Sequence, residues 1–445
     1  MSEPTILLPR PLPHQREFLL SPARHKVLVA GRKWGKSLTC LTPLLDGHGP
    51  GACLQGAAHG AKGAWIAPTI EISRVIWDAL KDATVGAWTE KHEIPSKITF
   101  PGGGSIVVRS AHDPDSLRGP NYDFVVMDEA AMLHPDTWSK VLEPTLAAPP
   151  SGRPGWAIFI STPAGVENWF RKVYDDAATR PGWARWQRPS SDNPVIAREF
   201  LEEKQATVSS YVWRQEYLAE FVSAAGGLFK REDARYYRVE GDEYVLPAGQ
   251  IVYPRDMQRF VTVDTATSTR DAACFTACMA WGIDTHGHLV LLELDLARIE
   301  GAEIMRRILA MCQRWECTAW IEENSTSKHL LSLMESEGIP FRTVTAGSQD
   351  KWTRAQEAVA LWERHMVLIP ERAAWLEGFE RQLYNFEPKG NDSDSVDAFA
   401  YAARIMRDEF TPSGSLLSAM VTSRRPKQYL PPGIAASGPS PWDRQ

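Results

Sequence analysis

The segment that most constrains this chain is AGRKWGKS at 30–37, which joins a continuous apolar run to a helix-like stretch. The run HKVLVA (25–30) has the apolar and β-branched residues of a strand that is buried on both faces, and the residues after the segment have helical character. A glycine-containing turn in this setting matches the phosphate loop G-x-x-x-x-G-K-[ST], with Ala30 in place of the first glycine. It predicts a nucleotide site on a parallel α/β sheet.

The chemistry of a phosphate loop assigns a role to each part of it. Backbone N–H groups from Gly31 to Gly35 would surround the β-phosphate, and the following helix would offer its N-terminus to the same charge. Lys36 would neutralise the β- and γ-phosphates, and the Ser37 hydroxyl would hold Mg²⁺. The alternative is a chance Gly-Lys-Ser turn, which the placement between a strand and a helix disfavours.

A second motif, YDFVVMDEAA at 122–131, is an apolar strand that ends in two acids. It suits a Walker B site in which Asp128 binds magnesium and Glu129 orients the attacking water. Adjacent acids at a strand end are otherwise simply solvated. Other short apolar runs at 64–69 and 155–165, with a hairpin at 98–111, complete the pattern of a parallel sheet. The phosphate loop and the Walker B motif together predict an NTPase.

A separate set of acids occurs in three later segments, VTVDTATSTRD, WIEEN and NDSDSVDAFAYAARI. A carboxylate inside an apolar strand is costly unless it binds a cation, and acids from three elements can hold two Mg²⁺ or Mn²⁺ ions for phosphodiester hydrolysis. A helix N-terminus also accepts acids as caps, so Asp392 is open to that reading. The candidates are Asp264, Glu322 or its neighbour Glu323, Asp392, Asp394 and Asp397.

The length of 445 residues predicts at least two hydrophobic cores. We expect a P-loop ATPase domain over 1–225 and a connector of mixed glycines and charges over 226–255. A second α/β domain with a mixed sheet, opening on an antiparallel meander, is expected over 256–410. Residues 411–445 are rich in Pro, Gly and Ser, which predicts a flexible tail.

Charge and hydropathy limit the partners. The chain has 49 basic and 55 acidic residues, a net charge of -6, so a nucleic acid would need a local basic lining. No apolar run reaches the length of a membrane span, and the N-terminus lacks the pattern of a secretion signal. We therefore expect a soluble intracellular protein that is not secreted and has no transmembrane segment.

These motifs resemble the large terminase subunit, the DNA-packaging motor of tailed bacteriophages, which also occurs in phage-derived gene-transfer elements. PHQREFLL (13–20) is similar to the family's adenine-contacting Q motif, with Gln15 as the candidate. The segment around Walker A resembles the family's variant, which adds Arg32, Lys33 and Trp34 to the nucleotide-binding set. DSLRGPNYDFVVMDEAAM resembles its L-R-G and Walker B pair and implies that Arg118 is an arginine finger acting on a neighbouring subunit, although a solvated loop arginine is the alternative.

The resemblance extends to FISTPAG (159–165), which implies that Ser161 and Thr162 form a coupling motif that senses the γ-phosphate. It also implies that the later acids belong to a ribonuclease H-like nuclease domain. The implied catalytic and metal-binding set there is Asp264, Glu322, Asp394 and Asp397. The implied partners are double-stranded DNA, the portal protein of the procapsid, the small terminase subunit and further copies of the chain in a ring, with no membrane.

Two other classes of protein fit parts of the pattern. A helicase-like or repair ATPase with a fused nuclease would normally carry a second RecA-like core, for which this chain lacks the length. A nucleotide-gated assembly module with a vestigial acid cluster would not bind two divalent ions or cleave DNA. The leading expectation is a motor that hydrolyses ATP to translocate duplex DNA into a procapsid and cleaves it.

Overall fold

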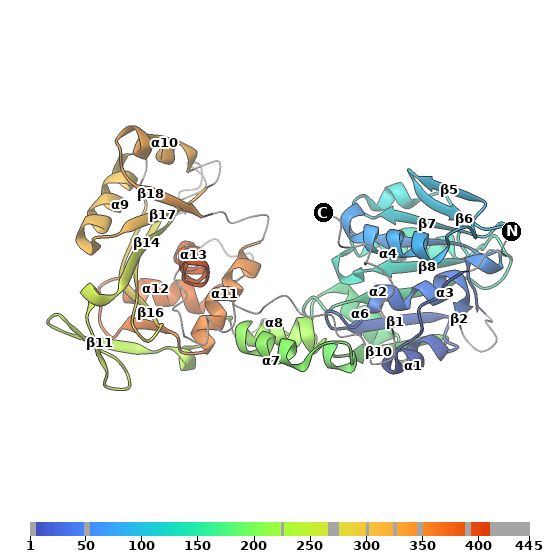
Figure 1. The fold of residues 1–445 in the computed structure, drawn as a ribbon, viewed down its shortest axis with the longest axis horizontal. Helices are drawn as coiled ribbons and strands as arrows, with labels where there is room; N and C mark the ends of the chain where they lie inside the picture. Colours follow the sequence, from blue (N-terminus) through green and yellow to red (C-terminus); the bar gives the residue numbers. More distant parts are fainter. Residues whose placement is uncertain are drawn as a thin grey trace, which may run out of the picture. The chain divides into compact units, whose positions relative to one another are not determined.

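The computed structural model describes residues 6–48, 54–223, 227–265, 276–299, 302–323, 327–344, 350–387 and 393–409. These residues form two compact units, whose elements are labelled in Figure 1. Unit 1 consists of described residues within 1–233, 350–364 and 383–390, and unit 2 of those within 234–349, 365–382 and 391–445. Two short segments from late in the sequence therefore complete the first unit.

Unit 1 is built on an eight-stranded sheet with the order β10-β1-β9-β8-β4-β7-β6-β5. The first six strands of that order are parallel, and β6 and β5 continue the sheet as antiparallel strands. The strands are β1 (His25–Ala30), β4 (Lys62–Ala67), β5 (Glu90–Glu93), β6 (Ser96–Thr99), β7 (Ser105–Ser110), β8 (Phe124–Asp128), β9 (Trp156–Ser161) and β10 (Trp183–Arg188). A separate small ribbon pairs β2 (Gly47–His48) with β3 (Leu54–Gln55).

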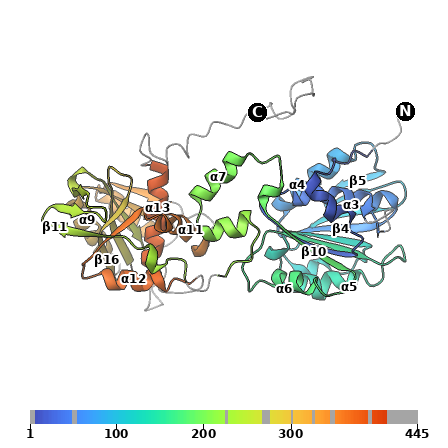
Figure 2. The same cartoon turned by 90° about the horizontal axis from the view of Figure 1, so that it is seen from below.

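Both faces of this sheet are covered, which explains why its central strands are continuously apolar. In β1, the Leu28 side chain belongs to the buried cluster on one face of the sheet. The Val27 and Val29 side chains belong to a second buried cluster on the opposite face. Figure 2 shows α3 and α4 on one side of the sheet and α5 and α6 on the other. The predicted parallel sheet, strand by strand at β1, β4, β8 and β9, is confirmed.

The helices of unit 1 are short except for α4, α7 and α11. They are η1 (Pro13–Gln15), α1 (Arg16–Leu20), α2 (Lys36–Thr39), α3 (Leu41–Leu45), η3 (Ala57–His59), α4 (Ile70–Ala83), η4 (Pro114–Leu117), η5 (Ala130–Met132), η6 (Thr137–Leu142), α5 (Glu143–Thr145), α6 (Trp169–Asp176), η7 (Ser190–Asp192), α7 (Arg198–Thr207), α8 (Ser210–Val212), η8 (Trp213–Tyr217), η9 (Arg231–Asp233) and α11 (Lys351–Glu363). α4 begins at the cap Thr69, whose hydroxyl accepts a hydrogen bond from the Ile72 N–H.

Unit 2 is built on a nine-stranded mixed sheet with the order β13-β12-β11-β19-β16-β15-β14-β17-β18. Its centre is the expected meander, in which β14, β15 and β16 are successive antiparallel neighbours. The strands are β11 (Tyr236–Glu240), β12 (Glu243–Val245), β13 (Ile251–Val252), β14 (Gln258–Asp264), β15 (Thr276–Ile283), β16 (Leu289–Ala297), β17 (Thr318–Glu322), β18 (Phe341–Val344) and β19 (Val367–Pro370).

Helices cover the sheet of unit 2 as well. Residues of α9 and α10, among them Ile308 and Met334, share a buried cluster with β14 and β17, and on α13 the Phe399 ring stacks on Trp281 of β15 at 5.2 Å. These helices are η10 (Pro254–Asp256), α9 (Ala302–Trp315), α10 (Lys328–Ser336), α12 (Leu376–Tyr384) and α13 (Asp394–Glu409). This is the α/β fold with a mixed sheet that was expected for the second domain.

The stretch 226–255, expected as a connector, contains β11, β12 and β13, which form one edge of the second sheet. β11 pairs in parallel with β19, a strand that follows it by more than a hundred residues, and this pairing cannot be read from local composition. No helix among the described residues is long and apolar enough to cross a membrane. The tail over 411–445 lies outside the described residues.

Candidate nucleotide site and candidate nuclease site

Three neighbouring parallel strands bring the predicted nucleotide-binding motifs to one edge of the first sheet. β9 lies between β1 and β8, and all three run in the same direction. The phosphate loop follows β1, Asp128 ends β8, and Ser161 ends β9. Because the carboxyl ends of parallel strands meet at the same edge, the loop and the acids converge where ligands bind in open α/β sheets.

The phosphate loop and the Walker B acid are in contact through Ser37. Its hydroxyl lies 3.2 Å from one Asp128 carboxylate oxygen and 3.3 Å from the other. Asp128 is buried, and this burial together with the adjacent Glu129 raises the pKa of its carboxyl group to about 7. A divalent cation between the hydroxyl and the carboxylate would offset that desolvation, so the pair fits the Mg²⁺ ligands expected from the motifs.

Lys36 is also buried, and its Nζ donates to the Ala30 carbonyl oxygen at 3.0 Å. Burial lowers the pKa of this ammonium group, against the opposing attraction of Glu129 and Asp128. The Lys36 ammonium group donates to backbone carbonyl oxygens of the phosphate loop. When a nucleotide binds, it can donate to phosphate oxygens in place of these carbonyls. The position predicted for Lys36 at the phosphates is consistent with this geometry.

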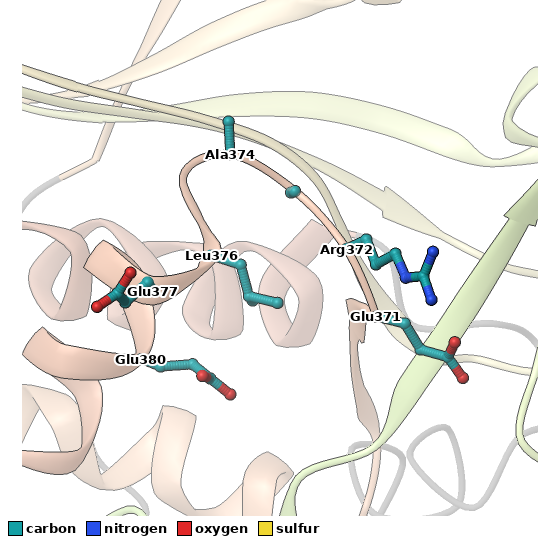
Figure 3. Close-up of a pocket in the computed structure, with 7 residues that line it drawn as sticks. Glu371, Arg372, Ala374, Leu376, Glu377 and Glu380 are labelled. Atoms are coloured by element: carbon teal, nitrogen blue, oxygen red, sulfur yellow. The ribbon is translucent and has the colours of Figure 1, made fainter.

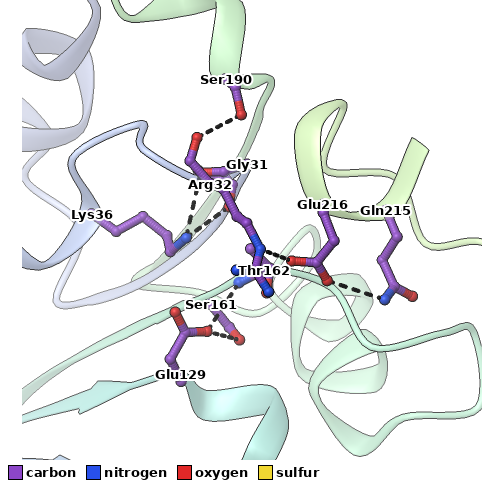
Figure 4. A network of polar contacts seen from close by, with 10 residues as sticks. Gly31, Arg32, Lys36, Glu129, Ser161, Thr162, Ser190, Gln215 and Glu216 are labelled. Atoms are coloured by element: carbon purple, nitrogen blue, oxygen red, sulfur yellow. Dashed lines mark hydrogen bonds and ion pairs between the residues drawn. The ribbon is translucent and has the colours of Figure 1, made fainter. Parts of the chain in front are cut away.

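Glu129 occupies a left-handed backbone position, with φ of 45°, directly after β8. Its Oε2 accepts a hydrogen bond from the Ser161 hydroxyl at 3.2 Å and one from the Thr162 N–H at 3.4 Å. Figure 4 shows these contacts beside Lys36. The structure therefore links the predicted water-orienting acid directly to the two residues of the predicted coupling motif, which lie 32 and 33 positions away.

Gly31 has no room for a side chain. A Cβ on this residue would lie 2.4 Å from the Ser190 hydroxyl oxygen and 2.6 Å from the Tyr217 carbonyl oxygen. Gly35 has φ of 98° and precedes α2, a conformation that L-residues with side chains rarely adopt. Both glycines of the predicted loop are therefore required by the backbone, and Ala30 ends β1 in the core, where a methyl group fits.

The three residues that the resemblance added to the loop have different surroundings. The Arg32 side chain is exposed and pairs through Nε with the Glu216 carboxylate at 2.6 Å. Lys33 is exposed with φ of 63°, and its carbonyl oxygen accepts from the Asn193 amide at 2.7 Å. Trp34 is 1% exposed, so only its backbone is available to a nucleotide.

The sequence reasoning missed the segment that contacts the loop, which is η8. Gln215 accepts the Gly165 N–H at 3.0 Å and donates to Glu216 at 3.3 Å, and Glu216 reaches Arg32 (Figure 4). A chain of contacts thus runs from the end of the predicted coupling motif to the phosphate loop. No local signal marks it, because Glu216 is 184 residues from Arg32.

The Q-motif candidate Gln15 lies beside the phosphate loop. Its amide nitrogen is 2.9 Å from the position of a Cβ on Gly35, and its amide oxygen accepts the Leu12 N–H at 2.9 Å. The neighbouring His14 ring nitrogen lies 3.1 Å from the Trp34 carbonyl oxygen. Arg118, by contrast, lies on the loop after η4, where its exposed guanidinium pairs with Asp115 at 2.7 Å.

The acids of the second set lie in unit 2 at the ends of adjacent elements. Asp264 ends β14 and Glu322 ends β17, each one residue beyond the paired residues Val263 and Ile321 of these parallel strands. Asp394 and Asp397 lie in the first turn of α13, which packs on β14 and β15. All four side chains are at least 90% buried.

The neighbouring acids have different environments. Glu323 is exposed while Glu322 is buried, and Asp392 lies outside the described residues. Within the described ranges, no group of three or more histidine, cysteine, aspartate or glutamate side chains is arranged to hold a metal ion. In the part of the chain that is described, the predicted acids are thus buried on neighbouring elements without forming a closed ligand set. Their chemistry, hard oxygen donors away from water, still fits Mg²⁺ or Mn²⁺.

Unit 2 also has an open hollow of about 550 Å³ between the end of β19 and α12. Figure 3 shows Glu371 and Arg372 on one side of it and Glu377 and Glu380 on the other. Glu380 accepts a hydrogen bond from the Tyr236 hydroxyl at 2.6 Å. None of the predicted site residues that the structure describes lines this hollow, so it adds nothing to either site.

Comparisons with known proteins support the resemblance noted in the sequence. Residues 80–235 match the family model of the terminase large subunit, T4likevirus-type, N-terminal. The large terminase subunit of Thermus virus P23-45 is 30% identical over 260 residues, which cover 50% of this chain and 51% of that protein. That of Escherichia phage T5 is 32% identical over 221 residues, 47% of each chain. The chain thus spans about half the length of the curated relatives it matches.

Solved structures agree in fold. The large terminase of a thermophilic bacteriophage superposes with a TM-score of 0.57 at 15% identity, covering 89% of this chain and 99% of that one. The same protein in complex with ADP gives a TM-score of 0.56 and covers 88% of this chain. The two units therefore share the fold of that large terminase, with the parallel and mixed α/β sheets that were expected.

Proposed function

The chain is similar to large terminase subunits, and from this similarity and the two sites we propose that it is a DNA-packaging motor subunit. It hydrolyses ATP to translocate double-stranded DNA into a procapsid, and it cleaves that DNA with a metal-dependent nuclease. The observation that carries the proposal is the convergence of Lys36, Ser37, Asp128 and Glu129 at the carboxyl edge of one parallel sheet. This arrangement supplies each group that ATP hydrolysis on a phosphate loop requires.

In the ATPase site, each residue has one role. Lys36 neutralises the β- and γ-phosphates, Ser37 and Asp128 hold Mg²⁺, and Glu129 orients the attacking water. The Mg²⁺ ion would supply charge neutralisation on the phosphate oxygens. The hydrogen bonds from Ser161 and Thr162 to Glu129 support a coupling role for these two residues. A shift of the Glu129 carboxylate during hydrolysis would change both hydrogen bonds and so move the segment after β9.

Arg118 acts on the nucleotide of a neighbouring subunit in the assembled ring. Its exposed side chain and its position on a loop, where it contacts Asp115 and the Lys140 carbonyl oxygen at 3.5 Å, support this role. The same assembly contacts the portal protein and the small terminase subunit, and it operates in the host cytoplasm. Rings that mix Arg118→Ala with Lys36→Ala subunits test this role.

In the nuclease site, Asp264, Glu322, Asp394 and Asp397 hold two Mg²⁺ or Mn²⁺ ions. Metal ions there would activate water and stabilise the charge that develops on the phosphodiester. The burial of Glu322 and the exposure of Glu323 support the choice between these neighbours. Glu322→Gln is therefore expected to abolish cleavage, and Glu323→Gln, its matched control, to retain it.

The ATPase proposal is tested by nucleotide turnover of the full chain with duplex and with single-stranded DNA. Stimulation by duplex is expected for a packaging motor, and stimulation by single strands alone would favour a helicase-like or repair ATPase.

Cleavage of plasmid DNA is measured with Mn²⁺, Mg²⁺ and Ca²⁺ in turn. Activity with the first two and none with Ca²⁺ is expected, because Ca²⁺ accepts the ligands in a looser geometry.

A further inference from the structure

The core of unit 1 contains a lysine that neither proposed site uses. Lys26 lies in β1 among apolar residues and is 0% exposed. Burial of an ammonium group is costly unless its donors are satisfied. Its Nζ donates to the carbonyl oxygens of Phe18 at 2.7 Å and Leu19 at 3.3 Å, and it lies 5.1 Å from the centre of the Phe18 ring.

The two carbonyls that Lys26 binds belong to the last turn of α1. A cation at the C-terminal carbonyls stabilises a helix, and α1 has only five residues, too few to be stable alone. η1, which contains Gln15, leads directly into α1. The position of Gln15 therefore depends on contacts that hold this short helix to the sheet.

β10 supplies the other contacts of α1. The Phe18 ring packs edge-on against Trp186 at 5.2 Å, and the Trp186 indole N–H donates to Glu17 at 3.0 Å. Arg188 forms an ion pair with the same Glu17 carboxylate. The helix is thus attached on one side to β1 and on the other to β10.

The same two strands also place the phosphate loop. β1 runs into the loop at Gly31, whose N–H donates to the Arg188 carbonyl oxygen at 2.9 Å at the end of β10. The same pair of strands, β1 and β10, therefore holds both the Gln15 amide and the phosphate loop. A substitution that removes a contact of α1 would move the amide relative to the loop and leave the conformation of the loop unchanged.

We propose that Lys26 is a positioning residue that, by anchoring α1, holds the Gln15 amide at the nucleotide base and sets a preference for adenine over guanine. An amide offers an acceptor and a donor side by side, which matches the N6 amino group and N7 of adenine. Guanine presents the O6 acceptor in place of the amino group, so the amide oxygen would lose its donor. The inference rests on the proposed ATPase function and on the adenine contact that the resemblance implies for Gln15, and it adds the role of Lys26 in positioning that contact.

The test measures kcat and KM for ATP and for GTP in four forms of the full chain. Lys26→Met keeps the apolar stem and removes the donors, and it is expected to lower the ratio of kcat/KM for ATP to that for GTP about tenfold. The loss is expected in KM, with kcat for ATP within about twofold, because the catalytic groups are untouched. Glu17→Ala, an exposed side chain, should shift the ratio in the same direction, and Leu20→Ala, an exposed residue of the same helix, should leave it unchanged.

Each outcome decides the question. A folded Lys26→Met protein, checked by circular dichroism and thermal unfolding, that keeps the wild-type ratio overturns the inference and leaves the ATPase function standing. Where Lys26→Met does not fold, Glu17→Ala decides in its place. A wild-type chain that hydrolyses ATP and GTP equally also overturns the inference, and one that hydrolyses neither contradicts the proposed function itself.

Discussion

Gly31→Ala is the perturbation whose effect follows most directly from the geometry of the phosphate loop. The added Cβ would lie 2.4 Å from the Ser190 hydroxyl oxygen and 2.6 Å from the Tyr217 carbonyl oxygen, where ordinary contact is roughly 3.5 Å or more. The Ser190 backbone nitrogen would also lie at 2.8 Å, so these atoms must move by roughly 1 Å, and two of the three belong to the backbone. Overpacking of this kind costs about 1–3 kcal/mol.

That cost disfavours the nucleotide-competent form of the loop. A penalty of about 1–3 kcal/mol lowers the competent fraction, and with it kcat/KM for ATP, roughly 5- to 150-fold. The assay is steady-state ATP hydrolysis together with nucleotide binding. Gly102→Ala is the matched control, because a Cβ there has its nearest atom at 3.8 Å in the same unit.

A double substitution tests the cause of the loss. Adding Ser190→Gly to Gly31→Ala removes the hydroxyl contact but leaves the contacts with the Tyr217 carbonyl oxygen and the backbone nitrogen of residue 190, so partial recovery is expected. The hydroxyl also donates to the Arg32 carbonyl oxygen at 2.6 Å, so Ser190→Gly alone is measured as well. A Gly31→Ala enzyme with the kcat/KM of the wild type, or a double variant with strictly additive losses, would refute this reasoning.

Three further predictions concern other parts of unit 1. Glu129→Ala should bind ATP but lose turnover, and hydrolysis at the wild-type rate would show that the Walker B assignment is wrong. Arg118→Ala should lower ATPase activity chiefly in assembled rings, on the order of 10³-fold, and mixing it with Lys36→Ala subunits should restore some activity; equal loss in isolated monomers would indicate a role within one subunit. Burial and the nearby Arg24 and Arg180 lower the pKa of His25 to about 3, below its usual value of 6.5, so stability should fall by about 4 kcal/mol as pH drops from 6.5 to 3. The dependence should flatten in His25→Asn, as measured by urea unfolding at each pH, and an unchanged slope would contradict the shift.

The sequence was sufficient for the elements that are continuously apolar. β1, β4, β8 and β9 are buried on both faces, so each reads as a hydrophobic run that ends in a glycine, a proline or an acid. The nucleotide site followed from these runs, because parallel strands place their carboxyl ends together. The meander of β14, β15 and β16 was recognised from its turns.

The elements that the sequence did not reveal depend on contacts between distant segments. β10 is the edge strand WARWQR, which is neither continuously apolar nor regularly alternating, and β11 to β13 join the second sheet through β19. The pairing of Arg32 with Glu216 and the anchoring of α1 by Lys26 also have no local signature. A buried lysine in a strand reads as an exception to the apolar pattern until its carbonyl partners are known.

The central claim is that one chain carries two separate chemistries. It is tested most directly by measuring ATP hydrolysis and Mn²⁺-dependent plasmid cleavage side by side in the full-length wild type, Lys36→Ala and Asp264→Ala proteins. We predict that Lys36→Ala loses ATP hydrolysis and retains cleavage, and that Asp264→Ala loses cleavage and retains ATP hydrolysis. Undiminished cleavage by Asp264→Ala, or the loss of both activities from either single substitution in a folded protein, would contradict the account.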